Sequence, residues 1–300
     1  MAENSIAHFS DIHMCGIEKI SIAQLLSKRL YGYFYWKFSR GKRYDYNILE
    51  ILINDLKNEH LDHVVITGDL VHLGLPAEFI SVKRFLRRID GTDKITLVPG
   101  NHDFYVPAGK KYYEKRWKAY ISTHDIIHKK GVIFPFVRFF NNIALVGVNS
   151  ALPTPPFFAY GFLGRSQLED LKDLLAKIPD KYFTVLLIHH PPVKSVATCN
   201  NSLVDMKGMT EIIKSGKIKL ILHGHTHYFN ISRVTSKIGE IPVIGVPPAV
   251  SIEIGKLSGY NIYYIKEIEG KWNLTVKRKE FSLQRKVFEV KEVQEITIVR

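Results

Sequence analysis

The segment ILHGHTHYF, residues 221–229, places His223, His225 and His227 at alternate positions after an apolar run. Neutral imidazole is a common metal ligand, and histidine also changes its charge near neutral pH, so such a cluster can be a metal site or a pH-sensitive group. The same residues can instead form structural hydrogen bonds in a turn around Gly224. A metal site would require further ligands from other parts of the chain.

Metal-capable side chains also follow four other short apolar runs of the sequence. These runs are 5–9, 63–67, 94–98 and 183–188, and a fifth, 217–222, precedes the histidine turn. In open α/β sheets, the loops at the carboxyl ends of the strands form the ligand crevice. We therefore expect one shared site built from these loops, with the following candidates: Asp11, His13, Asp69, Asn101, His102, Asp103, His189, His190, His225 and His227.

The elements that would position these side chains alternate along most of the chain. The five runs above, together with 143–148 and 241–246, are near-continuously apolar, which is typical of strands buried on both faces. Two segments carry an apolar helical face, and Ser166 with Glu169 forms a candidate capping box. After about residue 260 the pattern predicts hairpins followed by a polar tail, so we expect a single layered α/β domain over residues 1–300. The two apolar faces comprise Ile48, Leu49, Leu52, Ile53 and Leu56, and Phe79, Val82, Leu86 and Ile89.

The polar segments at the strand ends form an ordered set of short motifs. DxH and GD alone are common turn sequences, whereas GNHD is expected by chance on the order of 10⁻³ times in a chain of this length. Taken together, the set resembles the signature of the calcineurin-like metallophosphoesterases over roughly residues 5–250. Residues 146–156 and 161–175 also resemble the class III cyclic nucleotide phosphodiesterase branch. The motifs are Asp11-x-His13, Gly68-Asp69, Gly100-Asn101-His102-Asp103, His189-His190-Pro191 and Gly224-His225-Thr226-His227.

The resemblance implies a four-layer αββα sandwich with two central mixed β-sheets and two divalent metal ions at the strand ends. In this sequence it assigns one metal to Asp11, His13 and His227. It assigns the second metal to Asn101, His189 and His225, with Asp69 bridging both. His102 would be the catalytic histidine beside the leaving group. His190 is the less favoured neighbour of His189, and we expect His223 to be structural.

The chemistry of this ligand set fits phosphoester hydrolysis. All of the donors are oxygen or imidazole nitrogen, which suits Mn²⁺, iron, Zn²⁺ or Mg²⁺ without selecting one of them. Two such ions about 3.5–4 Å apart can clamp a phosphoester and supply hydroxide, because metal-bound water has a pKa near about 7. We expect in-line attack by the metal hydroxide without a covalent phosphoenzyme, and a protonated His102 would stabilise the transition state or protonate the leaving oxygen.

One motif departs from the pattern of the phosphoprotein phosphatases of this family. Those enzymes carry GDxVDRG, in which the second Asp orients the catalytic histidine and the Arg grips phosphate. Here the sequence is GDLVHLG, with His72 and Leu73 at those two positions. The departure argues against a phosphoprotein phosphatase. We therefore expect Asp103 or His72 to orient His102 in place of the missing Asp.

The composition limits the kinds of binding partner and the cellular compartment to be expected for this protein. The chain has 42 basic and 29 acidic residues and a formal net charge of +13, which favours an anionic partner or serves solubility. Hydrophobic residues make up 46% of the chain, which excludes intrinsic disorder, and the apolar runs are too short to cross a bilayer. The start of the sequence has no signal-peptide pattern, and Cys15 and Cys199 are the only cysteines, so we expect a cytoplasmic protein.

Residues 28–43, KRLYGYFYWKFSRGKR, combine six basic and six aromatic residues, and no acidic residue lies between Glu18 and Asp45. Leu26, Leu30, Tyr33 and Phe34 are spaced as one helical face. Such a segment can rest on an anionic membrane surface or pack against the domain as an ordinary helix.

These observations favour a phosphodiesterase for a nucleotide-type phosphodiester, such as a cyclic nucleotide. The alternative is a membrane-surface pyrophosphate hydrolase that resembles the UDP-2,3-diacylglucosamine hydrolases. A DNA-repair nuclease would suit the charge, but such nucleases usually carry additional capping domains, so nucleic acid is disfavoured. A scaffold that resembles the retromer subunit of this fold would usually lack the full ligand set. The native metals and the oligomeric state stay open.

Overall fold

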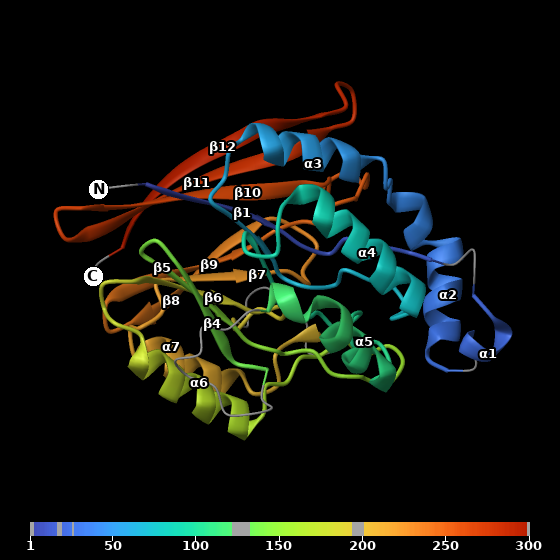
Figure 1. Ribbon diagram of the computed structural model, residues 1–300, viewed down its shortest axis with the longest axis horizontal. Coiled ribbons are helices and arrows are strands. Elements are labelled where there is room, and N and C mark those ends of the chain that lie inside the picture. The colour runs from blue at the N-terminus through green and yellow to red at the C-terminus, as the bar shows by residue number, and fades with distance from the viewer. Residues whose placement is uncertain (1–2, 17–19, 26, 122–132, 194–200, 299–300) are drawn as a thin grey trace.

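The apolar runs of the sequence form parallel strands of two six-stranded sheets in a computed structural model, which describes residues 3–16, 20–25, 27–121, 133–193 and 201–298 (Figure 1). Strands β1, β2 and β3 of the first sheet are parallel, and β10, β11 and β12 extend that sheet as an antiparallel meander. Strands β10 and β11 form the predicted hairpin, whereas β12 lies where a polar tail was predicted. In spatial order the first sheet contains β12 (Val287–Ile298), β11 (Lys271–Ser282), β10 (Gly259–Ile268), β1 (Asn4–Phe9), β2 (His63–Ile66) and β3 (Ile95–Leu97).

The second sheet has a parallel centre and two antiparallel edge strands. Strands β5, β6, β7 and β9 run parallel, while β4 and β8 pair antiparallel with their neighbours at the two edges. In spatial order this sheet contains β4 (Phe136–Phe140), β5 (Ile143–Gly147), β6 (Phe183–Leu187), β7 (Leu220–His223), β9 (Gly239–Gly245) and β8 (Asn230–Ser236). All seven predicted strands are present, whereas β4, β8 and β12 were not predicted.

Helices cover the outer faces of the two sheets, which confirms the predicted four-layer αββα sandwich (Figure 1). Helices α3 and α4 lie over the first sheet, α6 and α7 lie over the second, and α1 and α2 lie at the end of the molecule opposite both termini. The helices are α1 (Ile22–Leu25), α2 (Arg29–Phe38), α3 (Ile48–Asn58), α4 (Pro76–Ile89), α5 (Pro107–Trp117), α6 (Arg165–Lys177) and α7 (Met206–Lys214), with 3-10 helices η2 (Arg40–Arg43) and η3 (Lys118–Tyr120). No helix within the described residues is both long and apolar enough to span a membrane.

The main hydrophobic core fills the space between the two sheets, and a second core lies between the second sheet and its helices. In the main core the Phe183 ring of β6 lies 5.3 Å from the Trp272 ring of β11, so the two sheets meet directly. Leu171 and Leu175 of α6 belong to the second core. Each such fully buried side chain stabilises the fold by about 1.5–3 kcal/mol relative to an exposed one.

The predicted start of α6 is wrong. The helix begins at Arg165 with Gly164 as its N-cap, so Ser166 lies inside the first turn and forms no side-chain cap. The carboxylate of Asp205 instead accepts hydrogen bonds from the main-chain N–H groups of Leu163 and Gly164. A cap supplied from a segment about forty residues away is invisible to a local capping rule, because that rule considers only neighbouring positions.

Candidate dinuclear metal centre

The predicted site residues follow the carboxyl ends of parallel strands in both sheets. Asp11 and His13 follow β1, Asp69 follows β2, and Asn101 and His102 follow β3. The second sheet contributes His189 after β6, and His225 and His227 after β7. Because the loops of both sheets meet at the same end of the sandwich, residues more than 200 positions apart come into contact, as the pairing of Asp11 with His227 shows.

The first group comprises the predicted ligands Asp11, His13, Asp69 and His227, which offer ligand atoms within 4.8 Å of one another. Nε2 of His227 lies 3.1 Å from Oδ1 of Asp11. Nε2 of His13 lies 3.6 Å from the same Asp11 oxygen and 3.7 Å from Oδ2 of Asp69. These donor atoms therefore converge on one point, which is the arrangement expected around a single cation.

The second group lies on the other side of Asp69. Nε2 of His189 is 3.2 Å from Oδ1 of Asn101 and 3.5 Å from Oδ1 of Asp69. The second oxygen of Asp69 faces His13, so this carboxylate lies between the two groups, as a bridging ligand must. Nε2 of His225 donates to the carbonyl oxygen of Asn201 at 2.9 Å, which leaves its Nδ1 as a potential ligand atom.

Two neighbouring histidines have both ring nitrogens occupied by protein partners. Nδ1 of His190 bonds the Ser150 hydroxyl at 2.8 Å, and Nε2 bonds the Ala159 carbonyl oxygen at 3.1 Å. His223 bonds the Gly224 carbonyl oxygen and the Asn230 side chain in the same way. The geometry therefore favours His189 over His190 as a ligand and gives His223 a structural place.

The backbone is strained at the predicted ligands. Asp11, His13, Asp69, His225 and His227 all have positive φ angles, between 46° and 68°. Non-glycine residues rarely adopt this region, and such strain clusters at functional sites. The close approach of Gly224 adds to this constraint, since a Cβ there would lie 2.6 Å from Oδ2 of Asp11. The fold therefore holds these side chains in positions that local preferences oppose.

The protonation states of the site suit a cation. Burial opposes ionisation of Asp11 and Asp69, but the surrounding imidazoles outweigh it and hold the pKa of both carboxyls well below the usual range. Burial lowers the pKa of His13 to about 4 and that of His225 to about 3, so both rings are neutral at pH 7. At His189 the carboxylates of Asp69 and Asp11 outweigh burial and raise the pKa to about 9, so a divalent ion bound there would displace a proton from this ring. Ionised carboxylates and neutral imidazoles are the forms that bind divalent metals, so the residues present fit two such ions.

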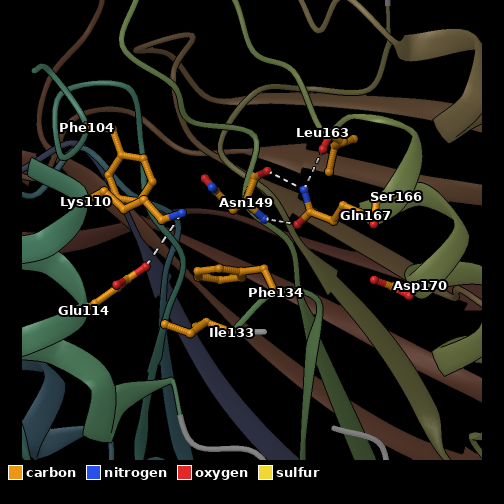
Figure 2. Close-up of a pocket in the computed structure, with 10 residues that line it drawn as sticks. All are labelled: Phe104, Lys110, Glu114, Ile133, Phe134, Asn149, Leu163, Ser166, Gln167 and Asp170. Atoms are coloured by element: carbon orange, nitrogen blue, oxygen red, sulfur yellow. Dashed lines mark hydrogen bonds and ion pairs between the residues drawn. The ribbon is translucent and has the colours of Figure 1, made fainter. Parts of the chain in front are cut away.

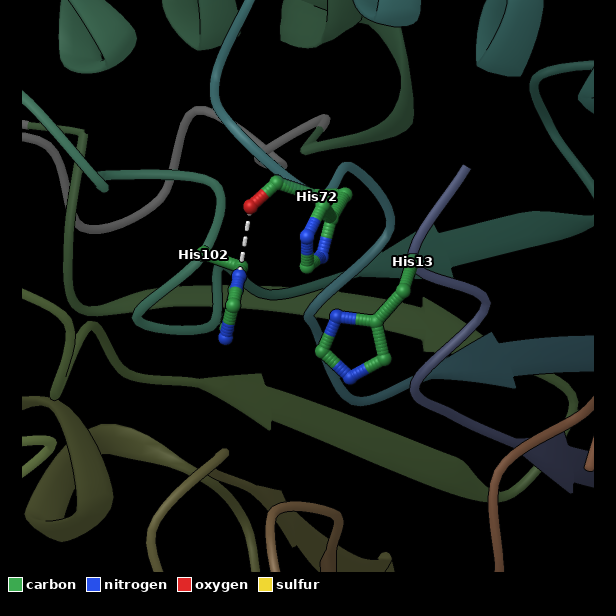
Figure 3. A group of neighbouring side chains, drawn as sticks. All are labelled: His13, His72 and His102. Atoms are coloured by element: carbon green, nitrogen blue, oxygen red, sulfur yellow. Dashed lines mark hydrogen bonds between the residues drawn. The ribbon is translucent and has the colours of Figure 1, made fainter. Parts of the chain in front are cut away.

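The main chain of His72 orients His102. Nδ1 of His102 donates to the carbonyl oxygen of His72 at 2.6 Å, and the two rings stack with centroids 5.3 Å apart (Figure 3). The main-chain N–H of His102 donates to Oδ1 of Asp69 at 2.7 Å. Asp103 has a different partner set, because its carboxylate accepts the main-chain N–H groups of Leu70, Val71 and Gly100. His102 therefore presents Nε2 to the site.

Arg40 of η2 is a site residue that the motifs did not reveal. Its Nη1 lies 3.3 Å from Nδ1 of His13 and 3.4 Å from Nε2 of His102. Arg40 also lines a cavity of about 390 Å³ that opens beside His102. Other residues of this cavity lining are Lys28, Tyr31, Tyr35, Tyr105, Phe157 and Phe158. The only signal in the sequence was the basic and aromatic composition of residues 28–43.

A second cavity of about 350 Å³ lies between α5 and α6 (Figure 2). Gln167 bridges its wall by bonding the main chain of Asn149 twice, and Lys110 pairs with Glu114 within α5. None of the described residues that line this cavity is a predicted ligand or catalytic residue. The chemistry of the candidate centre therefore belongs to the cavity beside His102.

Comparisons with known proteins agree with this geometry. The chain is 32% identical over 142 residues to a probable glycerophosphodiester phosphodiesterase (GpdQ) of Arcobacter nitrofigilis, which covers 47% of this chain and 46% of the relative, so the chain matches about half the length of that relative. It is 27% identical over 194 residues to a probable cyclic nucleotide phosphodiesterase of Vesicomyosocius okutanii, with 64% of this chain and 72% of the relative covered.

The solved structures show the same fold. A dimetal phosphatase from Danio rerio superposes with a TM-score of 0.62 at 15% identity, covering 99% of this chain and 98% of the other. The calcineurin-like phosphoesterase family model matches residues 5–229, which include all of the predicted metal ligands. The chain therefore belongs to the calcineurin-like phosphoesterase family.

Proposed function

We propose that this protein is a dinuclear-metal phosphodiesterase that hydrolyses a nucleotide-type phosphodiester, such as a cyclic nucleotide. The observation that carries the proposal is the position of Asp69, whose two oxygens face separate groups of donors. Asp11, His13 and His227 would hold one metal, and Asn101, His189 and His225 would hold the second. The phosphodiesterase names of the relatives favour a diester over the pyrophosphate bond of a lipid nucleotide.

The protein side chains would position the ester and transfer protons. When bound, two divalent ions would supply Lewis-acid polarisation of the phosphate and lower the pKa of the attacking water. His102 is anchored through Nδ1 on the His72 carbonyl, which turns its Nε2 toward the site. Burial lowers the pKa of His102 well below its usual range, so Nε2 would donate a proton to the leaving oxygen only after the ring is protonated, a change that a bound phosphate anion would favour. Lys28 is fixed by the Thr154 hydroxyl at 2.9 Å and lies over the Tyr105 ring, where it would face an anionic substrate.

The cavity beside His102 suits an organic group larger than glycerol. Its volume of about 390 Å³ lies within the range of small-molecule sites. Tyr31, Tyr35 and Phe157 contribute aromatic rings to the wall. Stacking of a nucleobase on such a ring contributes about 1–3 kcal/mol, so the wall supports a nucleotide-type substrate.

A hydrolysis panel on the Mn²⁺-loaded protein tests this proposal. The panel compares bis-p-nitrophenyl phosphate, p-nitrophenyl phosphate, 2′,3′- and 3′,5′-cyclic AMP, and UDP-2,3-diacylglucosamine, with His102→Ala as the control. We expect turnover of the diesters, with cyclic nucleotides preferred over the lipid nucleotide. A preference for the lipid nucleotide would replace this substrate class with the membrane-surface alternative.

A second proposal concerns where the enzyme works. The predicted helical face is wrong at Tyr33, which packs inward against the Leu73, Leu75 and Tyr105 cluster. The predicted Leu26 lies outside the described residues. The apolar residues that α2 turns outward are between 42% and 66% exposed, and Lys37 and Arg43 beside them are also exposed. An outward apolar face with basic neighbours fits an anionic membrane surface. The outward residues, which line no part of the cavity beside His102, are Leu30, Phe34 and Phe38.

Vesicle co-sedimentation tests this second proposal. The wild type should bind vesicles containing anionic phosphatidylserine and release them at high salt, because the attraction is partly electrostatic. A Leu30→Ala, Phe34→Ala, Phe38→Ala triple variant should bind weakly, while Val287→Ala, V290A and V293A on the exposed strand β12 should bind as the wild type does. Failure of the wild type to bind would leave this face to a protein partner or to solvent.

A further inference from the structure

We propose that Arg40 binds the phosphate group of the substrate, and that the packing of helix α2 holds Arg40 in position to do so. This inference rests on the proposed function, because the phosphate would lie at the same metal centre. Nη1 of Arg40 is within 3.4 Å of both His13 and His102, so its guanidinium stands between a predicted metal ligand and the predicted proton donor. An oxyanion transferred at this centre would lie within its reach.

The charge of Arg40 has no counter-ion within the part of the chain that the structure describes. Among the described residues no carboxylate forms an ion pair with it, and the nearby carboxylate of Glu253 pairs with Arg43 at 3.4 Å instead. The guanidinium lies 5.4 Å from the Tyr35 ring centroid and 5.9 Å from that of Tyr44. Aromatic faces can hold a guanidinium in place without neutralising it. Arg40 is thus a cation held in a fixed position, and an anionic ligand would supply the negative charge that neutralises it.

Steric constraints fix the position of η2. A Cβ on Gly41 would lie 2.9 Å from the carbonyl oxygen of Trp36, so only glycine permits the close turn between α2 and η2. The Trp36 ring in turn packs against His72 with centroids 4.8 Å apart and against Tyr46 at 6.0 Å. The segment that carries Arg40 is therefore locked onto the loop that orients His102.

Helix α2 packs against Leu73, at the point where the sequence departs from the GDxVDRG motif. A Cβ on Gly32 would lie 2.5 Å from Cδ2 of Leu73, so the helix backbone rests directly on that leucine. Leu73 occupies the position of the phosphate-gripping arginine in the GDxVDRG motif. Arg29 strengthens the contact by donating to the carbonyl oxygens of Leu73 and Gly74 at 2.9 and 2.8 Å. Leu73 thus forms an apolar surface on which α2 packs. Arg40, which follows α2 in the chain, approaches the candidate metal centre from a different segment than the arginine of the family motif.

The expected ligand is a tetrahedral phosphate oxyanion. Arginine presents a rigid fork of N–H donors that matches two phosphate oxygens, and a lysine at the same place would act only as a point charge. A bound oxyanion would also relieve the repulsion between the guanidinium and the two divalent cations beside it. Arg40→Lys should therefore restore only part of what Arg40→Ala removes.

The test compares Arg40→Ala and Arg40→Lys with Lys42→Ala, which removes an exposed cation two residues away. The first readout is calorimetric binding of inorganic phosphate to the Mn²⁺-loaded proteins, together with their Mn²⁺ content. We expect Arg40→Ala to raise the Kd for phosphate by about 10- to 100-fold, Arg40→Lys to have an intermediate Kd, and Lys42→Ala to match the wild type. The Mn²⁺ content should stay unchanged in all three variants.

The second readout is hydrolysis of bis-p-nitrophenyl phosphate, for which Arg40→Ala should lower kcat/KM by a similar factor. A phosphate Kd for Arg40→Ala within twofold of that for Lys42→Ala would overturn the proposal. Loss of Mn²⁺ or of the thermal transition in both Arg40 variants would assign the residue a structural role and would also overturn it. If the wild type hydrolyses no ester while Arg40→Ala still loses phosphate affinity, the proposed function fails and the phosphate site stands.

Discussion

Glu78 should make the stability of this protein depend on pH. Its carboxylate is fully buried and accepts N–H groups from Leu73 at 3.0 Å and from Leu75 at 2.8 Å. These hydrogen bonds favour the ionised form, but burial outweighs them and raises the pKa of Glu78 from 4.5 to about 7. Because Leu73 follows His72, whose carbonyl oxygen holds His102, the same carboxyl supports the catalytic loop.

The direction and the size of this pH dependence follow from the linkage between proton binding and folding. A folded-state pKa above the unfolded value means that the folded protein binds the extra proton, so this stabilisation is complete below about pH 4.5 and is lost as the pH rises through 7. The difference of about 2.5 pKa units corresponds to about 3 kcal/mol of unfolding free energy. We therefore expect Glu78→Gln to flatten the stability profile of the wild type by about 3 kcal/mol between about pH 4 and pH 8.

Urea unfolding of the chelator-treated proteins at several pH values measures this effect without a contribution from metal binding. The difference between the wild-type and Glu78→Gln profiles isolates this carboxyl from the other titrating groups. Glu211→Gln, which changes a carboxylate exposed on α7, is the matched control and should leave the wild-type profile unchanged. Parallel profiles for the wild type and Glu78→Gln would refute the assignment of the pH dependence to this residue.

Three further substitutions probe the centre and its support. His102→Ala should keep its Mn²⁺ but lose about 10²–10⁴-fold in kcat, measured with bis-p-nitrophenyl phosphate, since only proton transfer is removed; an unchanged kcat would exclude His102 from the reaction. Asp69→Asn should reduce the Mn²⁺ content at both positions by plasma mass spectrometry, because this carboxylate faces both groups; loss of only one equivalent would contradict a bridging role. Gly32→Ala should displace α2 and weaken phosphate binding, because a Cβ there would meet Leu73 and Tyr105 within 2.7 Å. The control is Gly91→Ala in an exposed turn, where a Cβ would meet only the side chain of Asp93, and it should behave as the wild type. Equal phosphate affinity in both glycine variants would separate α2 from the site.

The sequence predicts the parallel strands of both sheets well, because those strands are buried on both faces and therefore appear as continuous apolar runs. The edge strands β4 and β8 of the second sheet are harder to predict for the opposite reason. The residues of β8 are half-buried or exposed, and β4 carries the buried Arg138, whose guanidinium bonds the carbonyl oxygens of Thr92 and Ile95. Neither strand shows the apolar continuity that revealed the others.

The residues of the candidate site also differ in how well the sequence predicts them. Side chains in motifs after strand ends, such as His225 and His227, can be located from sequence because strand topology brings their loops together. The partner of His102 could not be found in this way, because it is the main-chain carbonyl of His72 and any residue type would supply it. Arg40 lies in no motif, and its approach depends on how α2 packs against Leu73, which is a tertiary contact.

Hydrolysis of bis-p-nitrophenyl phosphate by one preparation in three states tests the central claim most directly. The states are loaded with Mn²⁺, stripped by a chelator, and reloaded, and the metal content is measured in each. The account predicts two equivalents of Mn²⁺ and turnover in the loaded and reloaded states, with turnover lost in the stripped state. A fully loaded protein that leaves this diester and the cyclic nucleotides intact would contradict the assignment of a dinuclear-metal phosphodiesterase.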